Sequence, residues 1–253
     1  MIIDEPGRAD IPSLRRLWRE AFGDTEAFLD SFWRTAFSPS RCRCVTLDGE
    51  AVAALYWFDC EHMGRRIAYL YAIATAKSRR GQGLCRRLME NTHRHLQDLG
   101  YEGAVLVPGD RGLFGLYGKM GYTICGHIRK ISCDASESET GIRPIEPAEY
   151  EMLRRRFLPH GGVIQEKENT VFLQSMSKLY AGEGFLLAAR REGDTLYGTE
   201  LLGEENAAPA IVRALGCTKG IFRTVGTEIP FAMYLPFPDS RLDPPTYFGL
   251  AFD

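Results

Sequence analysis

The stretch "SRRGQGLCRRLM", Ser78 to Met89, places two glycines one residue apart at the predicted start of a helix, with an arginine pair on either side. The first turn of a helix carries backbone N–H groups without internal partners and the positive end of the helix dipole, so an anion is favoured there. Glycines let phosphate oxygens approach this backbone, and arginines add charge and paired hydrogen bonds. The stretch therefore predicts a site for a phosphate-bearing ligand, although a solvated helix start explains the glycines alone equally well.

The segments around this stretch predict a strand–helix–strand unit. "RRIAYLYAIAT" before it and "GAVLV" after it have the composition of strands. Between them, leucines recur at helical spacing from Leu84 until Gly100, which is a natural helix stop. Upstream, two helices are expected at "IPSLRRLWREAF" and "TEAFLDSFWRTAF", then an antiparallel pair joined by an Asp-Gly turn in "RCRCVTLDGEAVAALYWFD". The fold class predicted is α/β with a mixed sheet.

A second, smaller domain is expected after a polar linker at residues 134–141, "DASESETG". "IRPIEPAEYEMLRRRF" from Ile142 lies over "IDEPGRADIPSLRRLW" from Ile3 at a constant offset of 139 residues, which suggests a duplication, although two strand-then-helix openings can match by chance. We expect domains at residues 1–133 and 142–253. The further elements predicted in the second are a helix at "AAPAIVRALG" and strands at "GFLLAAR", "TLYGTELLG", "GIFRTVG", "PFAMYLPF" and "TYFGLAF".

The composition limits the function. The 253 residues are 45% hydrophobic and 25% charged, with no apolar run long enough to span a bilayer and no secretory signal, so we expect a cytoplasmic protein. Seven scattered cysteines indicate neither a disulfide framework nor a metal site. Residues 134–253 hold 12 basic and 18 acidic side chains, against 19 and 15 in residues 1–133. This mild, local positive balance indicates a small anionic ligand rather than a nucleic acid.

Three motifs resemble the core of the Gcn5-related N-acetyltransferase (GNAT) superfamily. Arg80, Gly83 and Cys85 fall on the specified positions of its pyrophosphate loop, Q/R-x-x-G-x-G/A, where Cys85 departs from the final Gly/Ala. "Ile73-Ala74-Thr75" is similar to the end of the family's fourth strand. "LFGLYGKMGY" is similar to the L-Y-x-x-x-G-F ending, with Tyr117 on the tyrosine.

Two positions depart from the family pattern: Lys77 replaces a usual proline, and Asp110 replaces a common asparagine. The resemblance covers about the first 133 residues. Within the superfamily it is most similar to the enhanced-intracellular-survival type, in which a degenerate second GNAT-like domain follows the first.

The resemblance implies an acetyl-CoA-dependent N-acetyltransferase that acts on a small-molecule or peptide amine by direct attack. Tyr117 would face the departing sulfur, as a proton donor or as a hydrogen-bond donor, and a backbone N–H near Ala74 would stabilise the oxyanion. Membrane and metal have no part in this hypothesis. The residues that the resemblance assigns to acetyl-CoA are Ile73, Ala74, Thr75, Arg80, Gly81, Gln82, Gly83, Leu84, Cys85 and Arg86.

The general base stays open at this point. Relatives often use Glu or His where this chain has Tyr69 and Tyr71, and neither phenol is a good base at neutral pH. Glu61 and His62 in the preceding turn are substitutes, and the resemblance adds the terminal carboxylate at Asp253. The alternative function is a catalytically inactive CoA-binding regulatory or scaffolding protein, and transfer of another acyl group also fits. The acidic surplus of residues 134–253 suggests a cationic acceptor.

Overall fold

A computed structural model describes residues 1–252. The first half of the chain forms four helices and six strands. They are β1 (Ile2–Asp4), α1 (Ile11–Phe22), α2 (Glu26–Thr35), β2 (Cys42–Leu47), β3 (Glu50–His62), β4 (Arg65–Thr75), α3 (Leu84–Asp98), β5 (Gly103–Leu106), α4 (Arg111–Gly118) and β6 (Thr123–Asp134). The predicted helix at residues 11–22 and the predicted strand pair at its Asp-Gly turn are confirmed.

The second half follows a similar order of elements, with the short strand β8 (Ile164–Gln165) added between its first two helices and, within residues 1–252, no counterpart of α4. It holds β7 (Ile142–Pro144), α5 (Pro147–Phe157), β8 (Ile164–Gln165), α6 (Glu168–Met176), β9 (Lys178–Gly182), β10 (Phe185–Glu192), β11 (Thr195–Gly203), α7 (Ala208–Ala214), β12 (Lys219–Val225) and β13 (Ile229–Pro236). In each half an edge strand and two helices precede an antiparallel run of three strands, and a helix then leads to a strand parallel to the last of them. This agrees with the suggested duplication.

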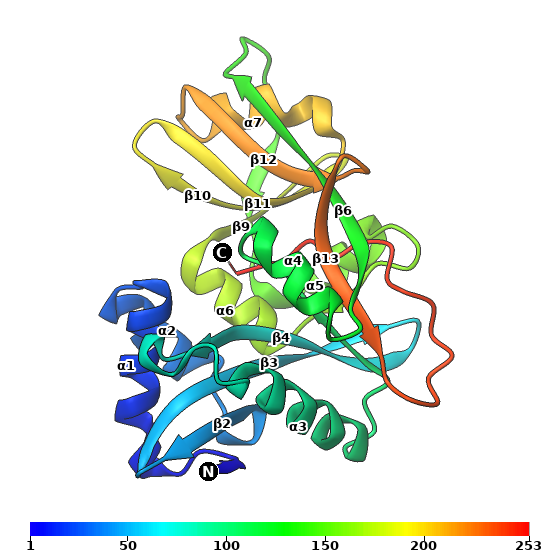
Figure 1. Cartoon of the computed structure of the whole chain (residues 1–253). Coiled ribbons are helices and arrows are strands. Elements are labelled where there is room, and N and C mark those ends of the chain that lie inside the picture. The colour runs from blue at the N-terminus through cyan, green and yellow to red at the C-terminus, as the bar shows by residue number, and fades with distance from the viewer. Residues whose placement is uncertain (253) are drawn as a thin grey trace.

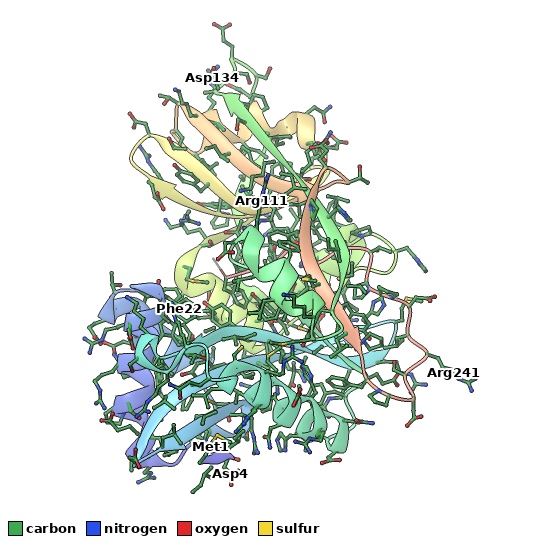
Figure 2. The ribbon with its side chains drawn as sticks, in the orientation of Figure 1. Met1, Asp4, Phe22, Arg111, Asp134 and Arg241 are labelled. Carbon is green, nitrogen blue, oxygen red and sulfur yellow. The ribbon has the colours of Figure 1, made fainter. Side chains whose placement is uncertain are left out.

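One continuous sheet joins the two halves, in the order β1-β2-β3-β4-β5-β13-β6-β12-β11-β10-β9-β7, with β8 paired to β3. Strand β13 comes from the second half but lies between β5 and β6 of the first, and β6 extends to pair with β12. In Figure 1 these two long strands run from the lower half of the molecule to the upper half. Asp134, at the end of β6, lies at the opposite end of the molecule from Met1 and Asp4 (Figure 2).

Strands β4 and β5 separate part of the way along their length. They pair in parallel from Ile67–Gly103 to Leu70–Leu106, and β4 then continues to Thr75 without β5. The register against β3 shifts in the same segment, where Ala72 has a positive φ of 48°. Such a bulge bends a strand away from its neighbour, so the sheet opens between β4 and β5.

The predicted strand at "TYFGLAF" is wrong. Residues 247–252 are buried but form no ladder, apart from a single bridge between Tyr247 and Gly162. Side chains hold the segment instead: Gln165 donates to the carbonyl of Leu250 over 2.8 Å and accepts from its N–H over 3.3 Å. Its apolar composition is compatible with a strand, but the backbone of Leu250 is hydrogen-bonded by the side chain of Gln165 instead of by a neighbouring strand.

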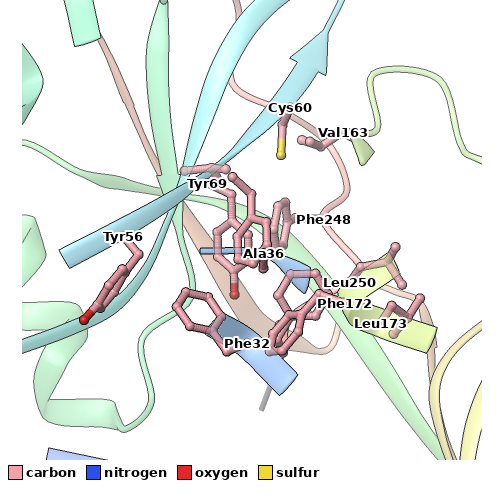
Figure 3. Close-up of a cluster of buried hydrophobic side chains, with 14 of the residues drawn as sticks. Phe32, Ala36, Tyr56, Cys60, Tyr69, Val163, Phe172, Leu173, Phe248 and Leu250 are labelled. Atoms are coloured by element: carbon pink, nitrogen blue, oxygen red, sulfur yellow. The ribbon is translucent and has the colours of Figure 1, made fainter. Parts of the chain in front are cut away.

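An aromatic cluster lies under β3 and β4 and joins the two halves. Phe32 of α2, Phe172 of α6 and Phe248 gather around Tyr69, as Figure 3 shows. The ring of Phe252 lies 4.9 Å from that of Phe58 and 5.1 Å from that of Phe172. The terminal segment is therefore part of the core that covers this face of the sheet.

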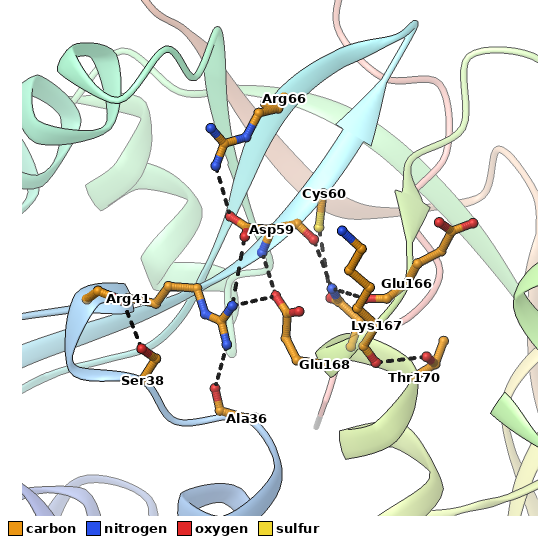
Figure 4. Close-up of polar contacts among 12 residues, drawn as sticks. Ala36, Ser38, Arg41, Asp59, Cys60, Arg66, Glu166, Lys167, Glu168 and Thr170 are labelled. Atoms are coloured by element: carbon orange, nitrogen blue, oxygen red, sulfur yellow. Dashed lines mark hydrogen bonds and ion pairs between the residues drawn. The ribbon is translucent and has the colours of Figure 1, made fainter. Parts of the chain in front are cut away.

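A polar network joins β3 to α6 beside this core (Figure 4). The carboxylate of Glu168 accepts the N–H of Asp59 over 3.1 Å, and Asn169 donates to the carbonyl of Asp59 over 2.9 Å. Arg41 lies 3.3 Å from Glu168. Within residues 1–252, the helices are all too short or too polar to cross a membrane.

Candidate active site

A cavity of about 400 Å³ lies where β4 and β5 separate. One wall is formed by β4 at Tyr71, Ala72 and Ile73, and α4 contributes Tyr117. Aromatic rings and aliphatic side chains form most of the lining, so a reacting group inside is largely shielded from water. The structure thus brings together two residues predicted from the sequence, Ile73 and Tyr117.

The glycine-arginine loop lies outside this cavity, at the start of α3. Gly81 and Gly83 have left-handed backbone conformations, with φ of 78° and 73°, and an added Cβ would meet nothing within 4 Å at either position. Glycine is required there for its conformation, and the loop surface is open. The N–H groups of residues 81–86 donate to no acceptor within residues 1–252. This arrangement fits an anionic diphosphate.

The other residues of the loop divide into two groups. The side chains of Arg80, Gln82 and Arg86 are exposed, and the Nε of Arg80 donates to the carbonyl of Thr75 over 3.2 Å. Leu84 is 5% exposed and belongs to the same apolar cluster as Tyr117, against which Cys85 also packs. The loop is therefore attached directly to the wall that carries Tyr117. Ala74, 6% exposed, and Thr75 lie between the cavity and this loop.

The hydroxyl of Tyr117 faces the cavity from α4 and is largely buried. Burial raises the pKa of Tyr117, and the hydroxyl forms no hydrogen bond to any residue in the described part of the chain. A phenol of ordinary pKa already donates its proton to a thiolate at a cost of roughly 2 kcal/mol, and a raised pKa increases that cost. Asp110, in the position of the family's asparagine, instead caps α4 by accepting from Gly112 over 2.7 Å.

The loop between α1 and α2 closes a third side of the cavity. Phe22 and Phe28 line it together with Asp24, whose carboxylate accepts a hydrogen bond of 2.8 Å from the indole N–H of Trp18. Asp24 is the one acidic side chain among the described lining residues. It is half-buried, and its hydrogen bond to a buried ring fixes the position of the carboxylate at the cavity.

The terminal segment forms the fourth side. Ala251 and Phe252 line the cavity, and the hydroxyl of Tyr71 donates to the carbonyl of Phe252 over 2.9 Å. Behind the segment, the hydroxyl of Tyr247 donates to the buried carboxylate of Glu200 over 3.1 Å. An added Cβ on Gly249 would overlap the same carboxylate, which is why a glycine stands there.

The candidates for a general base have different surroundings. Tyr69 and Tyr71 are core aromatics with rings 5.9 Å apart. Glu61 and His62 lie at the far end of β3 and do not line the cavity; His62 is 2% exposed, its Nε2 lies 2.9 Å from the carbonyl of Asp243, and burial lowers its pKa. The prediction for Asp253 falls outside the described residues and stays a prediction.

The comparisons assign the fold to a family. Residues 3–125 match the family model "Acetyltransferase (GNAT) domain". A mixed sheet that opens between its fourth and fifth strands, beside a glycine loop at a helix start, defines a protein of the GNAT class. Residues 3–125 belong to the GNAT superfamily, as the sequence motifs predicted. No curated protein sequence matches the chain.

Solved structures of GNAT proteins resemble nearly the whole chain. A GCN5-related N-acetyltransferase from Kribbella flavida has a TM-score of 0.69 at 16% identity, over 92% of this chain and 70% of that one. Eis1 from Mycobacterium abscessus has a TM-score of 0.60 at 14% identity, over 88% of this chain and 65% of that one. A GCN5-related N-acetyltransferase from Sphaerobacter thermophilus has a TM-score of 0.56 at 13% identity, over 99% and 98%. At such identities the likeness shows the fold.

Reasoning from sequence missed the acceptor side of the cavity. Trp18 and Phe28 have the helical spacing of core residues, and Asp24 has the appearance of an ordinary loop carboxylate. Met176 and Phe252 come from the second half, in segments without a motif. The one available signal was the high aromatic content of "TEAFLDSFWRTAF", which exceeds what the packing of one helix requires. Within residues 1–252, no cluster of side chains suited to holding a metal ion occurs.

Proposed function

We propose that this protein is an N-acetyltransferase that transfers an acetyl group from acetyl-CoA to a primary amine in a ternary complex. The observation that supports it best is the position of the cavity: it lies in the opening between β4 and β5, with Tyr117 on one wall and Asp24 on another. Residues 3–125 match an acetyltransferase domain, so the proposal assigns acetyl-CoA as the donor, and when bound it would supply the activated thioester. The seven free thiols support a cytoplasmic location.

Each part of the site has a separate task in this proposal. The N–H groups of residues 81–86 and the guanidinium groups of Arg80 and Arg86 hold the diphosphate. The bulged backbone near Ile73 directs the acyl arm into the cavity. The carboxylate of Asp24 attracts the protonated amine, orients it toward β4 and accepts its proton through solvent at the mouth.

Tyr117 acts at the opposite wall. Its protonated hydroxyl donates a hydrogen bond to the leaving sulfur, and the apolar lining strengthens that bond by excluding water. Because burial raises the pKa of Tyr117, the hydroxyl stays protonated throughout the neutral range. The residues of the second half, Met176 and Phe252, shape the space available to the acceptor.

The test is acetylation of a panel of primary amines, followed by release of free CoA. Tyr117→Phe keeps the ring and removes only the hydroxyl, so we expect unchanged stability and a fall in kcat of about 10²-fold. Asp24→Asn should raise KM for the amine more than it lowers kcat, and acetyl-CoA affinity should not change. Tight CoA binding without turnover on any amine would favour the inactive regulatory protein, and an unchanged kcat in Tyr117→Phe with chemistry rate-limiting would remove Tyr117 from the mechanism.

A further inference from the structure

A second cavity adjoins the active-site cavity on the side of the second half. Its volume is about 420 Å³, and it shares Phe28, Met176, Ala251 and Phe252 with the first cavity as common wall. Beyond these four apolar residues the lining holds Ala27 and five polar residues. The two cavities are therefore neighbours on either side of this shared wall.

The second cavity is lined by hydroxyl groups and one cation. Ser177 and Thr199 lie with their hydroxyl oxygens 3.3 Å apart, and Arg190 contributes its guanidinium. The Nε of Arg190 donates to Glu192 over 2.8 Å and its guanidinium lies 5.4 Å from the ring centre of Tyr197, whereas its terminal nitrogens form no hydrogen bond within residues 1–252. No carboxylate occurs among the described residues that line the cavity.

One buried hydroxyl in this cavity has no partner. Ser31 of α2 is 8% exposed, its Oγ is fully buried, and it forms no hydrogen bond within the described part of the chain. A buried hydroxyl without a partner costs free energy, roughly 1–3 kcal/mol, unless a ligand supplies the hydrogen bond. Its place in the lining points to a polar group of a ligand.

A basic groove continues from the second cavity to the surface. It shares Ser175, Met176, Ser177 and Arg190 with that cavity and adds further cations, Lys178 and Arg191, without any carboxylate among its described lining residues. Acidic side chains of the second half also stand at this groove: the Nε of Arg190 pairs with Glu192 over 2.8 Å, and Arg191 lies 3.5 Å from Asp194. Lys178 and the terminal nitrogens of Arg190 have no carboxylate partner within the described residues.

We infer that the acceptor is a primary amine that carries a carboxylate or phosphate group at its far end. The amine lies beside Asp24, its middle passes the apolar wall of Phe28 and Phe252, and its anionic end lies between Ser31 and Arg190. This inference rests on the proposed function and specifies its substrate class. Arg190 is a specificity-determining residue in it and does not touch the reacting atoms.

The experiment compares four amines with the same six-carbon spacer: 1-aminohexane, 6-aminohexanoate, 6-aminohexyl phosphate and 1,6-diaminohexane. Binding of each is measured by thermal shift in the presence of CoA, and kcat/KM is measured with acetyl-CoA. We expect kcat/KM for at least one of the two anionic probes to exceed that for 1-aminohexane by about tenfold, because the anionic group is hydrogen-bonded. We expect the lowest kcat/KM for 1,6-diaminohexane. The two anionic arms distinguish a carboxylate from a phosphate.

Variants separate this specificity from a structural role. Arg190→Gln should lower kcat/KM for the anionic probe about tenfold and leave kcat/KM for 1-aminohexane unchanged. Arg190→Lys should restore part of the preference for the anionic probe. Arg156→Gln, an exposed arginine of α5 distant from the cavities, is the matched control. Ser31→Ala should weaken binding of the anionic probe severalfold. It should not lower Tm, because the hydroxyl of Ser31 has no hydrogen bond to the described part of the protein.

The outcomes distinguish the two proposals. If amines are acetylated but 1,6-diaminohexane is preferred, or if Arg190→Gln lowers kcat/KM equally for all probes, the inference is overturned while the proposed function stands. Binding of none of the four probes in the presence of CoA also overturns it. If acetyl-CoA does not bind and no amine is acetylated, the proposed function itself fails.

Discussion

Glu200 has a buried carboxylate, and we expect the loss of its charge to lower the free energy of unfolding of this protein. Glu200 is 0% exposed and Arg154 2% exposed. The Nε and Nη2 of Arg154 donate to the two carboxylate oxygens over 2.7 and 2.9 Å, and the hydroxyls of Tyr150 and Tyr247 donate over 3.0 and 3.1 Å. Burial alone would lower the pKa of Arg154, but the charge and hydrogen bonds of Glu200 outweigh it and raise that pKa.

The substitution Glu200→Gln keeps the size of the side chain and removes its charge. The guanidinium of Arg154 would stay positive and buried without a counter-ion, so the free energy of unfolding should fall by about 3–5 kcal/mol. For a chain of this length such a loss corresponds to a fall in Tm of about 6–20 °C. Because Tyr247 and Gly249 contact the same carboxylate, the terminal segment should loosen and kcat/KM should fall as well.

Urea unfolding followed by fluorescence measures the free energy, and thermal unfolding measures Tm. Glu50→Gln is the matched control: Glu50 pairs with Arg16 over 3.0 Å at the surface, with 68% of its side chain exposed, and its loss should cost no more than about 0.5 kcal/mol. If Glu200→Gln loses less than about 1 kcal/mol, the network is not the buried ion pair that this reasoning requires.

Two further predictions concern the donor loop and pH. Arg86→Gln should weaken CoA binding about fivefold, whereas Arg87→Gln on the same helix turn should have little effect, and isothermal titration with CoA would compare them; equal losses would contradict the assignment. Burial lowers the pKa of His93, whose ring lies 2.8 Å from the hydroxyl of Tyr122, from 6.5 to about 4. Folding thus favours the neutral ring, so His93 does not reduce the free energy of unfolding above pH 6.5. As the pH falls from 6.5 toward 4, the free energy of unfolding should decrease, by about 3 kcal/mol in total. His93→Gln should flatten the urea-measured stability across this range, and a wild-type curve that is already flat there would refute the assignment.

Local patterns predicted most helices and strands because those elements follow from periodicity and turn residues. The helix at residues 11–22 and the strand at residues 195–203 have the predicted bounds, set by an amphipathic stripe in one case and by flanking turns in the other. The bulge at Ala72 is different. No property of an alanine indicates a positive φ, so the local sequence does not predict this bulge.

The donor loop could be predicted from sequence, and the acceptor cavity could not. Gly81 and Gly83 form their site with the helix that follows them, so one short segment contains the whole signal. Asp24 and Phe252 are 228 positions apart and meet only because the terminal segment is bound by Gln165 and Glu200. That meeting depends on tertiary contacts, which leave no pattern in either segment.

The placement of β13 between β5 and β6 has a consequence for how such a chain can evolve. The first half needs β13 of the second half between β5 and β6, and the second half needs the extended end of β6 beside β12. Removing either half by truncation would therefore leave unpaired strand edges in the half that remains. A stop codon anywhere before Ile229 removes a central strand and exposes the edges of both neighbours. The second half can therefore lack the glycine-arginine loop and still be retained by selection, because the sheet of the first half is incomplete without β13.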